Sequence, residues 1–342
     1  MRKVAIAGLA IVAAVGLATL GVVWWWYRSV DAFAARPFGS DEEKVVEVPT
    51  GARVREVAQQ LAAAGVVSDS LRFEWLAKNL KRDRQIKAGE YAFAGPLLPE
   101  KVLEALALNR VKLHHCTVPE GLRLDEVAAV LEGCHWGPAA EYLRLGRDEV
   151  LARQWGIKGT SLEGYLFPDT YSFPRGPKPE AVLHKMVEAF FAALARAQAQ
   201  GRPDVHLDAH ETATLASIIE KETAVPDERP RVSCVFHNRL KKNMRLETDP
   251  TVVYAKILRT GRFDGDIRRE DLEYRHPYNT YTVKGLPPGP IANAGAASLE
   301  AALAPIDCDD LFFVACGGGA HRFCPDYDCH KKFVDQCQLH RP

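Results

Sequence analysis

An uninterrupted apolar run near the N-terminus constrains this chain most. Val4 to Tyr27 contains no charged residue and ends on three tryptophans and a tyrosine, Trp24 to Tyr27. Such a run is long enough to cross a hydrocarbon core of about 30 Å, and aromatic clusters are typical of the membrane interface. Residues 1–27 are therefore predicted to form a cytoplasmic tail and one transmembrane helix.

The residues around this run favour an uncleaved anchor over a signal peptide. A cleaved signal has a shorter apolar centre and small residues at the cleavage site, whereas bulky indoles stand there in this chain. Arg2 and Lys3 precede the run, and such positive charge stays on the cytoplasmic side. We expect the N-terminus inside, a polar tether at residues 28–43, and the remainder on the outer, periplasmic face of the cytoplasmic membrane.

Length and charge limit the remaining possibilities. The chain has 342 residues, of which 47% are hydrophobic, so it is long enough for two or three domains with ordinary cores. The formal net charge is zero, and no nucleic-acid partner is expected, because such binding needs a basic surface. The sequence also lacks a glycine-rich phosphate loop. We expect a substrate that is held by hydrogen bonding and stacking.

An internal repeat follows the tether. The segment VPTGARVREVA at 48–58 aligns with VPEGLRLDEVA at 118–128. Each copy predicts a short strand, a turn and an amphipathic helix. The chain therefore contains two related strand–helix units.

The first unit extends into a β-α-α-β pattern over residues 44–114, with a second helix near 70–80 and a returning segment at 88–93. This pattern resembles a LysM-type module, which in other proteins binds glycans that contain N-acetylglucosamine; the alternative is a spacer. The second unit and a connecting region occupy 115–208. A mixed α+β catalytic core with a cysteine-rich tail is expected over 209–342, so the predicted fold class is α+β.

A helix that begins near Ala209 carries the strongest candidate for chemistry. It places four residues on one face: Leu215, Ile218, Ile219 and Glu222. A carboxyl group in an apolar stripe must be paired, protonated or used, and desolvation raises its pKa toward that of a general acid near neutral pH. Glu220 projects from another face. Pro226 predicts that the helix ends soon after Glu222, beside a loop.

A structural role for Glu222 is the alternative, since an acidic residue in an apolar stripe is often the partner of an arginine. Four arginines downstream are candidates for that role: Arg229, Arg231, Arg239 and Arg245. Polar and aromatic clusters also follow, of the kind that line sugar subsites. These clusters favour the catalytic interpretation.

At these residues the chain resembles a known family, the membrane-anchored endolytic murein transglycosylases, also called the YceG-like or MltG family. Five segments carry the resemblance: LEGYLFPDTY at 162–171, SIIEKET at 217–223, VFHNRL at 235–240, MRLETDPTVVY at 244–254 and YNTYTVKGLPPGPIANAG at 278–295. It extends from the anchor to about His321. It implies that Glu222, the second glutamate of EKET, is the catalytic residue.

The resemblance also implies the reaction and the partners. A lytic transglycosylase needs one acid and no metal or cofactor, because the attacking hydroxyl belongs to the substrate. The acid cleaves the bond between N-acetylmuramic acid and N-acetylglucosamine and leaves a 1,6-anhydro end. The implied partners are peptidoglycan glycan strands, the cytoplasmic membrane and the peptidoglycan synthases (penicillin-binding proteins), beside which the family is thought to end growing strands.

Further residues are candidates for substrate binding, although each has a structural alternative. Thr223 is expected to hydrogen-bond near the carboxyl group, and Asp169 is a candidate sugar contact. Five residues are expected to orient the glycan: Asn238, Asp249, Tyr254, Asn279 and Tyr281. Glu247 stands where the family's Leu-Gln-Thr-Asp-Pro segment has Gln.

Two other functions stay open at this point. A second carboxylate such as Glu247, with room for a water, would allow an inverting glycoside hydrolase. A scaffold that binds glycan without cleaving it would leave Glu222 with a structural role.

The cysteines depart from the family pattern. Eight are present, and five lie near the C-terminus: Cys308, Cys316, Cys324, Cys329 and Cys337. Outside the membrane such a cluster is expected to form disulfides, and a Cys/His zinc site is the alternative, although the spacing fits no standard ligand set. Cys234, inside the candidate catalytic segment, is expected to be a buried free thiol.

Overall fold

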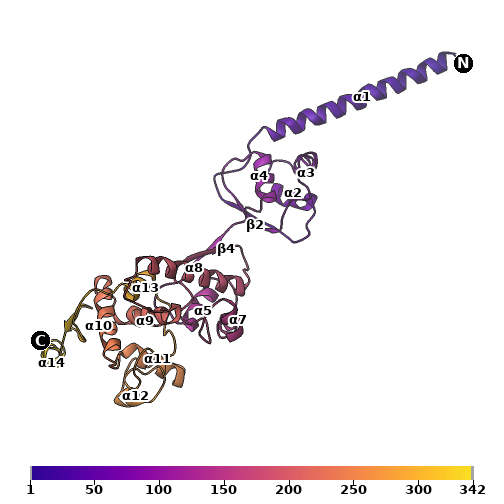
Figure 1. Ribbon diagram of the computed structural model, residues 1–342. Coiled ribbons are helices and arrows are strands. Elements are labelled where there is room, and N and C mark those ends of the chain that lie inside the picture. The colour runs from indigo at the N-terminus through magenta and orange to yellow at the C-terminus, as the bar shows by residue number, and fades with distance from the viewer. Residues whose placement is uncertain (1, 340–342) are drawn as a thin grey trace. The chain divides into compact units, whose positions relative to one another are not determined.

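The computed structural model describes residues 2–339, which divide into two compact units. The first comprises the chain up to His114 with Ser172–Arg175, and the second comprises His115–Tyr171 with the residues from Gly176 onward. The described strands form three two-stranded sheets, and helices make up most of the remainder (Figure 1). The mixed α+β class is thus confirmed.

The elements follow the chain in this order. Those before His114 are α1 (Arg2–Ala34), β1 (Lys44–Val48), α2 (Val54–Ala63), α3 (Ser70–Asn79), β2 (Gly89–Phe93) and α4 (Pro99–Ala107). The next are β3 (His114–Thr117), α5 (Leu124–Gly133), α6 (Ala139–Gly146), α7 (Glu149–Gln154), β4 (Thr170–Phe173), α8 (Pro179–Gln200) and α9 (Ala209–Glu222). The last are η1 (Pro226–Glu228), α10 (Arg229–Lys241), α11 (Asp249–Thr260), α12 (Arg269–Glu273), α13 (Ala296–Leu303), β5 (Phe312–Ala315), β6 (His321–Cys324), α14 (Tyr327–Val334) and η2 (Asp335–Leu339).

The N-terminal apolar run is one helix, and its part from Ile11 to Ala34 is long and apolar enough to cross a membrane. The helix continues past Tyr27, so the predicted tether is helical as far as Ala34. Val30 and Phe33 explain this difference, because they are buried, at 1% and 7% exposure, where α1 packs against α3 and α4. Apolar contacts with the first unit thus extend the helix into the region expected to be a linker.

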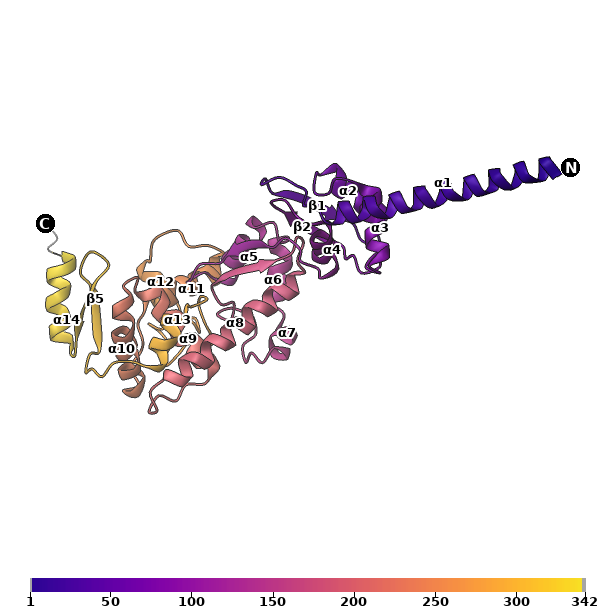
Figure 2. The same ribbon diagram turned by 90° about the horizontal axis from the view of Figure 1, so that it is seen from above.

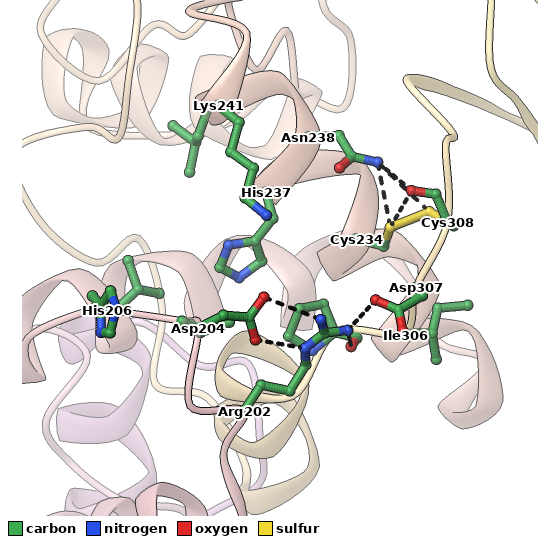
Figure 3. Close-up of a pocket in the computed structure, with 14 residues that line it drawn as sticks. Arg202, Asp204, His206, Cys234, His237, Asn238, Lys241, Ile306, Asp307 and Cys308 are labelled. Carbon is green, nitrogen blue, oxygen red and sulfur yellow. Dashed lines mark hydrogen bonds and ion pairs between the residues drawn. A yellow bond between two sulfur atoms is a disulfide. The ribbon is translucent and has the colours of Figure 1, made fainter.

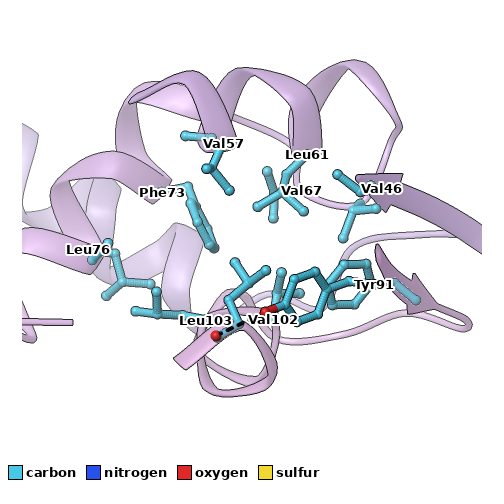
Figure 4. Packing of buried hydrophobic residues seen from close by; sticks show 14 of the residues in the cluster. Val46, Val57, Leu61, Val67, Phe73, Leu76, Tyr91, Val102 and Leu103 are labelled. Carbon is cyan, nitrogen blue, oxygen red and sulfur yellow. Dashed lines mark hydrogen bonds between the residues drawn. The ribbon is translucent and has the colours of Figure 1, made fainter. Parts of the chain in front are cut away.

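The first unit has the β-α-α-β order expected from the sequence. β1 and β2 pair antiparallel, with Val46 opposite Tyr91, and α2 and α3 pack against each other. Their apolar side chains enclose one core with Val102 and Leu103 of α4 (Figure 4). That this unit is a LysM-type module stays a prediction.

The sequence repeat corresponds to a structural repeat. In each copy a turn glycine takes a left-handed conformation, with φ of 80° and 75°. Each following helix is capped in the same way: Glu56 accepts the backbone N–H of Arg53 at 3.0 Å, and Glu126 accepts that of Arg123 at 2.9 Å. The first copy lies in the first unit and the second copy in the second unit.

The second unit is mainly helical, with α9 among α10, α11 and α13 (Figure 1). Helix α13 also packs on α8, so the segments 115–208 and 209–342 share one compact unit. The stripe of Leu215, Ile218 and Ile219 on α9 is fully buried, as its spacing predicts. The helix ends at Glu222, and Pro226 opens η1, as expected.

The C-terminal part is a disulfide-bonded hairpin. Strands β5 and β6 pair antiparallel, and β5 packs beside α10 and α14 (Figure 2). Four disulfides are present: Cys116–Cys134, Cys234–Cys308, Cys316–Cys337 and Cys324–Cys329. The expectation of disulfides near the C-terminus is confirmed.

The expectation that Cys234 is a free thiol is wrong, because it pairs with Cys308. The two cysteines are 74 residues apart in the chain, and they meet because the segment after α13 returns along α10. The side-chain amide of Asn238 on α10 stabilises this returning segment by donating hydrogen bonds to the carbonyl oxygens of Cys308 at 2.8 Å and Asp310 at 3.1 Å.

Candidate active site

Glu222 lies where two clefts meet. The α11 cleft, of about 340 Å³, is bounded by Arg123, Tyr254 and Ile257. The hairpin cleft, of about 410 Å³, is bounded by Arg239, Tyr281, Phe312 and Tyr327. Glu222 and Asp249 line both of them. The last residue of α9 is therefore reachable from two directions.

The surroundings of Glu222 raise the pKa of its carboxyl group toward neutral pH. The side chain is half-buried, and this burial raises its pKa to about 7. A hydrogen bond from the Thr248 hydroxyl to Glu222 Oε1 opposes the rise, while the negative charge of Asp249 adds to it. Near pH 7 the group can give up a proton and take one back, as an acid–base catalyst must.

Glu220, two residues before Glu222, has a structural role, which provides a comparison within the same helix. Its carboxylate accepts hydrogen bonds from Arg229 at 3.3 Å, Ser298 Oγ at 2.7 Å and the backbone N–H of Gly295 at 3.2 Å. Among the described residues, no arginine lies within 4.0 Å of the Glu222 carboxyl oxygens. The arginine-partner interpretation therefore describes Glu220 and does not describe Glu222.

The loop before α11 fixes the position of Thr248, whose hydroxyl hydrogen-bonds to Glu222. Thr248 is buried, and its backbone N–H donates to Thr280 Oγ1 at 3.1 Å. Thr251 Oγ1 donates to the Thr248 carbonyl at 2.7 Å and lies 2.8 Å from Thr280 Oγ1. Three buried threonines thus fix the hydroxyl that contacts the acid. The sequence pattern did not single out Thr248.

Three predicted binding residues lie with Glu222. Asp249 lines both clefts, and its Oδ1 accepts the Tyr281 hydroxyl at 2.8 Å. Tyr254 lines the α11 cleft, and its hydroxyl donates to Glu163 at 3.4 Å. These residues surround the carboxyl group with hydrogen-bonding and aromatic side chains.

Two other predicted residues hold loops. The Thr223 hydroxyl donates to Glu228 Oε2 at 3.2 Å, and this buried residue lines neither cleft. Asn279 is fully buried, and its amide donates to three backbone carbonyls, of Asp271, Leu272 and Tyr274. Their side chains hydrogen-bond to other parts of the protein and do not line the two clefts.

Asn238 lines a different pocket of about 280 Å³ (Figure 3). The charges there are paired with one another, since Arg202 binds both Asp204 and Asp307. His237 Nε2 donates to the Ala302 carbonyl at 2.9 Å. Asn238 therefore lies in a pocket separate from the Glu222 clefts.

Glu163 is a buried carboxyl group that sequence reasoning missed. Burial raises its pKa to about 8, and Oε1 accepts the Leu124 N–H at 3.0 Å. The sequence feature that could have identified it is an acidic residue within a segment of otherwise mainly apolar residues, Leu162–Leu166. The same segment supports the helix that carries Glu222, because the Tyr165 hydroxyl hydrogen-bonds to His210 of α9 at 2.8 Å.

The remaining acidic candidates differ in position. Glu247, in a left-handed conformation with φ of 49°, is exposed and paired with Arg239 at 3.3 Å in the hairpin cleft. Asp169 lines neither cleft, and its Oδ1 accepts the neighbouring Thr170 N–H at 2.7 Å. The described residues contain no group of three or more His, Cys, Asp or Glu side chains placed to hold a metal ion.

A carboxyl group with a pKa near neutral, placed between two clefts, is the arrangement of an acid–base catalyst that acts on an extended polar substrate. The chain belongs to the YceG-like family, whose model matches residues 46–336. It is 31% identical over 306 residues to a protein of Bacillus subtilis named endolytic murein transglycosylase, covering 84% of this chain and 82% of that one.

Two further relatives agree. A Streptococcus pneumoniae protein of the same name is 28% identical over 312 residues, which cover 82% of this chain and 56% of that protein. A crystal structure of a YceG-like protein from Listeria monocytogenes superposes with a TM-score of 0.57 at 31% identity, covering 86% of this chain and 99% of that one.

Proposed function

We propose that this protein is an endolytic lytic transglycosylase of peptidoglycan, anchored in the cytoplasmic membrane with its N-terminus inside. One observation carries the proposal: the carboxyl group of Glu222 stands between two clefts with its pKa raised to about 7, and no arginine of the described residues pairs with it. The relatives named endolytic murein transglycosylase point to the same substrate.

The proposed reaction uses Glu222 twice. Its proton passes to the oxygen that joins N-acetylmuramic acid to N-acetylglucosamine, and this bond breaks as the muramyl C1 gains positive charge. The resulting carboxylate then takes the proton of the C6 hydroxyl of the same muramyl residue, whose oxygen bonds to C1. The products are a 1,6-anhydro end and a new free end, and no water is consumed.

The two clefts suit an internal cut. A strand that is cleaved away from its ends needs room for sugars on both sides of the scissile bond. The α11 cleft and the hairpin cleft provide that room on either side of Glu222. In this scheme Thr248 orients the acid, and Asp249, Tyr254 and Tyr281 position the sugars.

The products distinguish this reaction from hydrolysis. Purified sacculi digested with the protein should yield 1,6-anhydro ends, which mass spectrometry separates from reducing ends by the mass of one water. A glycoside hydrolase is the second candidate, because Asp249 supplies a second carboxylate beside Glu222. Reducing ends in place of anhydro ends would establish that candidate and refute the proposal.

Two neighbouring glutamates provide a matched test of the acid. Glu222→Gln should lower cleavage by roughly 10²–10⁴-fold, because the amide cannot donate a proton in the same way. Glu220→Gln changes the same charge on the same helix, and it should lower the unfolding temperature while cleavage persists, since Glu220 pairs with Arg229. Cleavage that survives in Glu222→Gln would refute the assignment of Glu222 as the acid, whereas no cleavage by the wild-type protein would support a glycan-binding scaffold.

Three finer roles complete the proposal. The β-α-α-β module binds the glycan as LysM-type modules do, the second unit lies on the outer face of the membrane, and cleavage ends strands beside the synthases. Support comes from the order of β1, α2, α3 and β2 and from the apolar helix ending at Ala34. Labelling of single cysteines at the two ends of α1 in intact cells tests the orientation.

A further inference from the structure

The hairpin cleft has an aromatic wall that the mechanism above does not use. Phe312 of β5 and His330 of α14 stack with ring centroids 5.2 Å apart and planes 26° apart. Tyr327 lies 5.9 Å from Phe312, and the Arg239 guanidinium lies over the Phe312 ring at 5.0 Å. We call Phe312, Tyr327 and His330 the hairpin wall. All three line the cleft that contains Glu222.

The hairpin wall has unused binding capacity. Tyr327 is 64% exposed, although a large aromatic side chain is normally covered. His330 Nδ1 is buried and has no hydrogen-bond partner among the described residues. A buried polar atom without a partner is costly, so a ligand that pairs with it is favoured.

The wall is fixed relative to the candidate acid. Glu228 accepts the Thr223 hydroxyl at 3.2 Å and both the backbone N–H and Nδ1–H of His321, at 2.9 and 2.7 Å. This chain of contacts joins the residue after Glu222 to β6. Arg239 Nε also donates to the Leu311 carbonyl at 2.6 Å, immediately before β5. A ligand on the wall is therefore held at a defined position relative to Glu222.

The chemistry of the cleft favours sugar rings over charged ligands. The positive charge of Arg239 is paired with Glu247, and Glu222 and Asp249 line the same cleft. An acidic stem peptide would meet these carboxyl groups. A pyranose ring instead packs its C–H face on an aromatic ring and hydrogen-bonds its hydroxyl and N-acetyl groups to carboxylates and imidazole.

We infer that the hairpin wall is a sugar-binding subsite, which holds an N-acetylated hexose of the glycan strand on one side of the scissile bond. The inference rests on the proposed function for the identity of the strand. The disulfides Cys316–Cys337 and Cys324–Cys329 hold the hairpin that carries the wall, and Cys234–Cys308 ties the preceding segment to α10.

Binding to the non-cleaving Glu222→Gln protein tests the subsite separately from catalysis. The probe is a set of uncrosslinked glycan strands of alternating N-acetylglucosamine and N-acetylmuramic acid, with stem peptides present or removed by an amidase. Tyr327→Ala, added to Glu222→Gln, should weaken binding ~10-fold, the equivalent of one lost stacking contact. Tyr327→Phe keeps the ring and should weaken binding less.

His330→Ala should also weaken binding, and Phe263→Ala is the matched control, because Phe263 is a 39% exposed aromatic outside both clefts. The loss in Tyr327→Ala should be equal for strands with and without peptides. Unchanged affinity in Tyr327→Ala and His330→Ala overturns the inference, as does a loss confined to peptide-bearing strands. If Glu222→Gln binds neither strand, the inference and the proposed substrate both fail; if it binds and wild type does not cleave, only the proposed reaction fails.

Discussion

The two units differ in what they bury. Among the described residues, every buried polar or charged side chain lies in the second unit, including Glu163, Arg239, Asp271 and Asn279. The core of the first unit is made of apolar and aromatic side chains. Buried polar groups are costly unless they are paired, and they fix side chains and loops in defined positions when they are. The second unit is therefore the one whose interior fixes polar side chains in defined positions, as a reactive site requires.

The sequence repeat makes the comparison sharper. Arg53 and Arg123 occupy the same position in the two copies, directly before a helix. Arg53 is exposed, whereas Arg123 is half-buried and lines the α11 cleft. The same local motif thus supports a helix in one unit and contributes to the candidate site in the other.

The largest predicted effect comes from matched core substitutions in the two copies. Leu61 and Leu131 are both fully buried, so replacing either with alanine should cost about 2–5 kcal/mol of its unit's stability. Leu61→Ala should lower the unfolding temperature of the first unit and leave cleavage by the second unchanged. Leu131→Ala should lower cleavage as the second unit unfolds. Calorimetry with a cleavage assay measures both, and equal losses of cleavage would contradict the division.

A buried amide should matter in the second unit. Asn279→Ala leaves three backbone carbonyls without their donor, so we expect a loss of about 2–3 kcal/mol in the unfolding free energy. Because Asn279 precedes Thr280, which supports Thr248, cleavage should fall as well. Urea denaturation and the cleavage rate provide the two measurements. A stable variant with full activity would remove Asn279 from this account.

The raised pKa of Glu222 predicts a pH-dependent cost to stability. Its pKa is 4.5 in the unfolded chain and about 7 in the fold, so the folded state binds the proton more tightly. The stability from this group is complete below pH 4.5 and is lost as the pH rises through 7. Glu222→Gln should therefore gain about 1–2 kcal/mol relative to wild type between pH 5 and pH 8, a figure reduced for partial exposure. A pH-independent difference would contradict the shift.

The smallest predicted effect is in the first unit. The hydroxyl of Tyr91, a fully buried residue, donates to the Lys87 carbonyl at 2.8 Å. Tyr91→Phe keeps the ring in the core and should cost only ~1 kcal/mol, with no change in cleavage. Thermal unfolding of the variant checks this. A loss as large as that of Asn279→Ala would show that the first unit also depends on buried polar contacts.

Local pattern was enough to predict much of the second unit's central helix. The spacing of Leu215, Ile218 and Ile219 placed Glu222 on the buried face, and Pro226 placed the helix end. Both are effects of residues within a few positions of one another. The repeat likewise predicted two similar strand–helix units.

Contacts between distant segments could not be predicted in this way. Thr248 reaches Glu222, Cys234 meets Cys308, and the hairpin wall lines the cleft only because the chain folds back on itself. Periodicity reports which residues share a face, and it does not report what lies opposite that face. For the same reason the pattern did not predict that the side chains of Asn279 and Thr223 hydrogen-bond to neighbouring loops.

The most direct measurement is the titration of Glu222 itself. Difference infrared spectra between wild type and Glu222→Gln, recorded from pH 4 to pH 9, isolate the carboxyl stretch of this side chain. A protonated band that disappears with a midpoint near 7 is the predicted result. A midpoint near 4.5, the ordinary value for a glutamate, would contradict the claim that the fold keeps this acid ready to donate its proton at neutral pH.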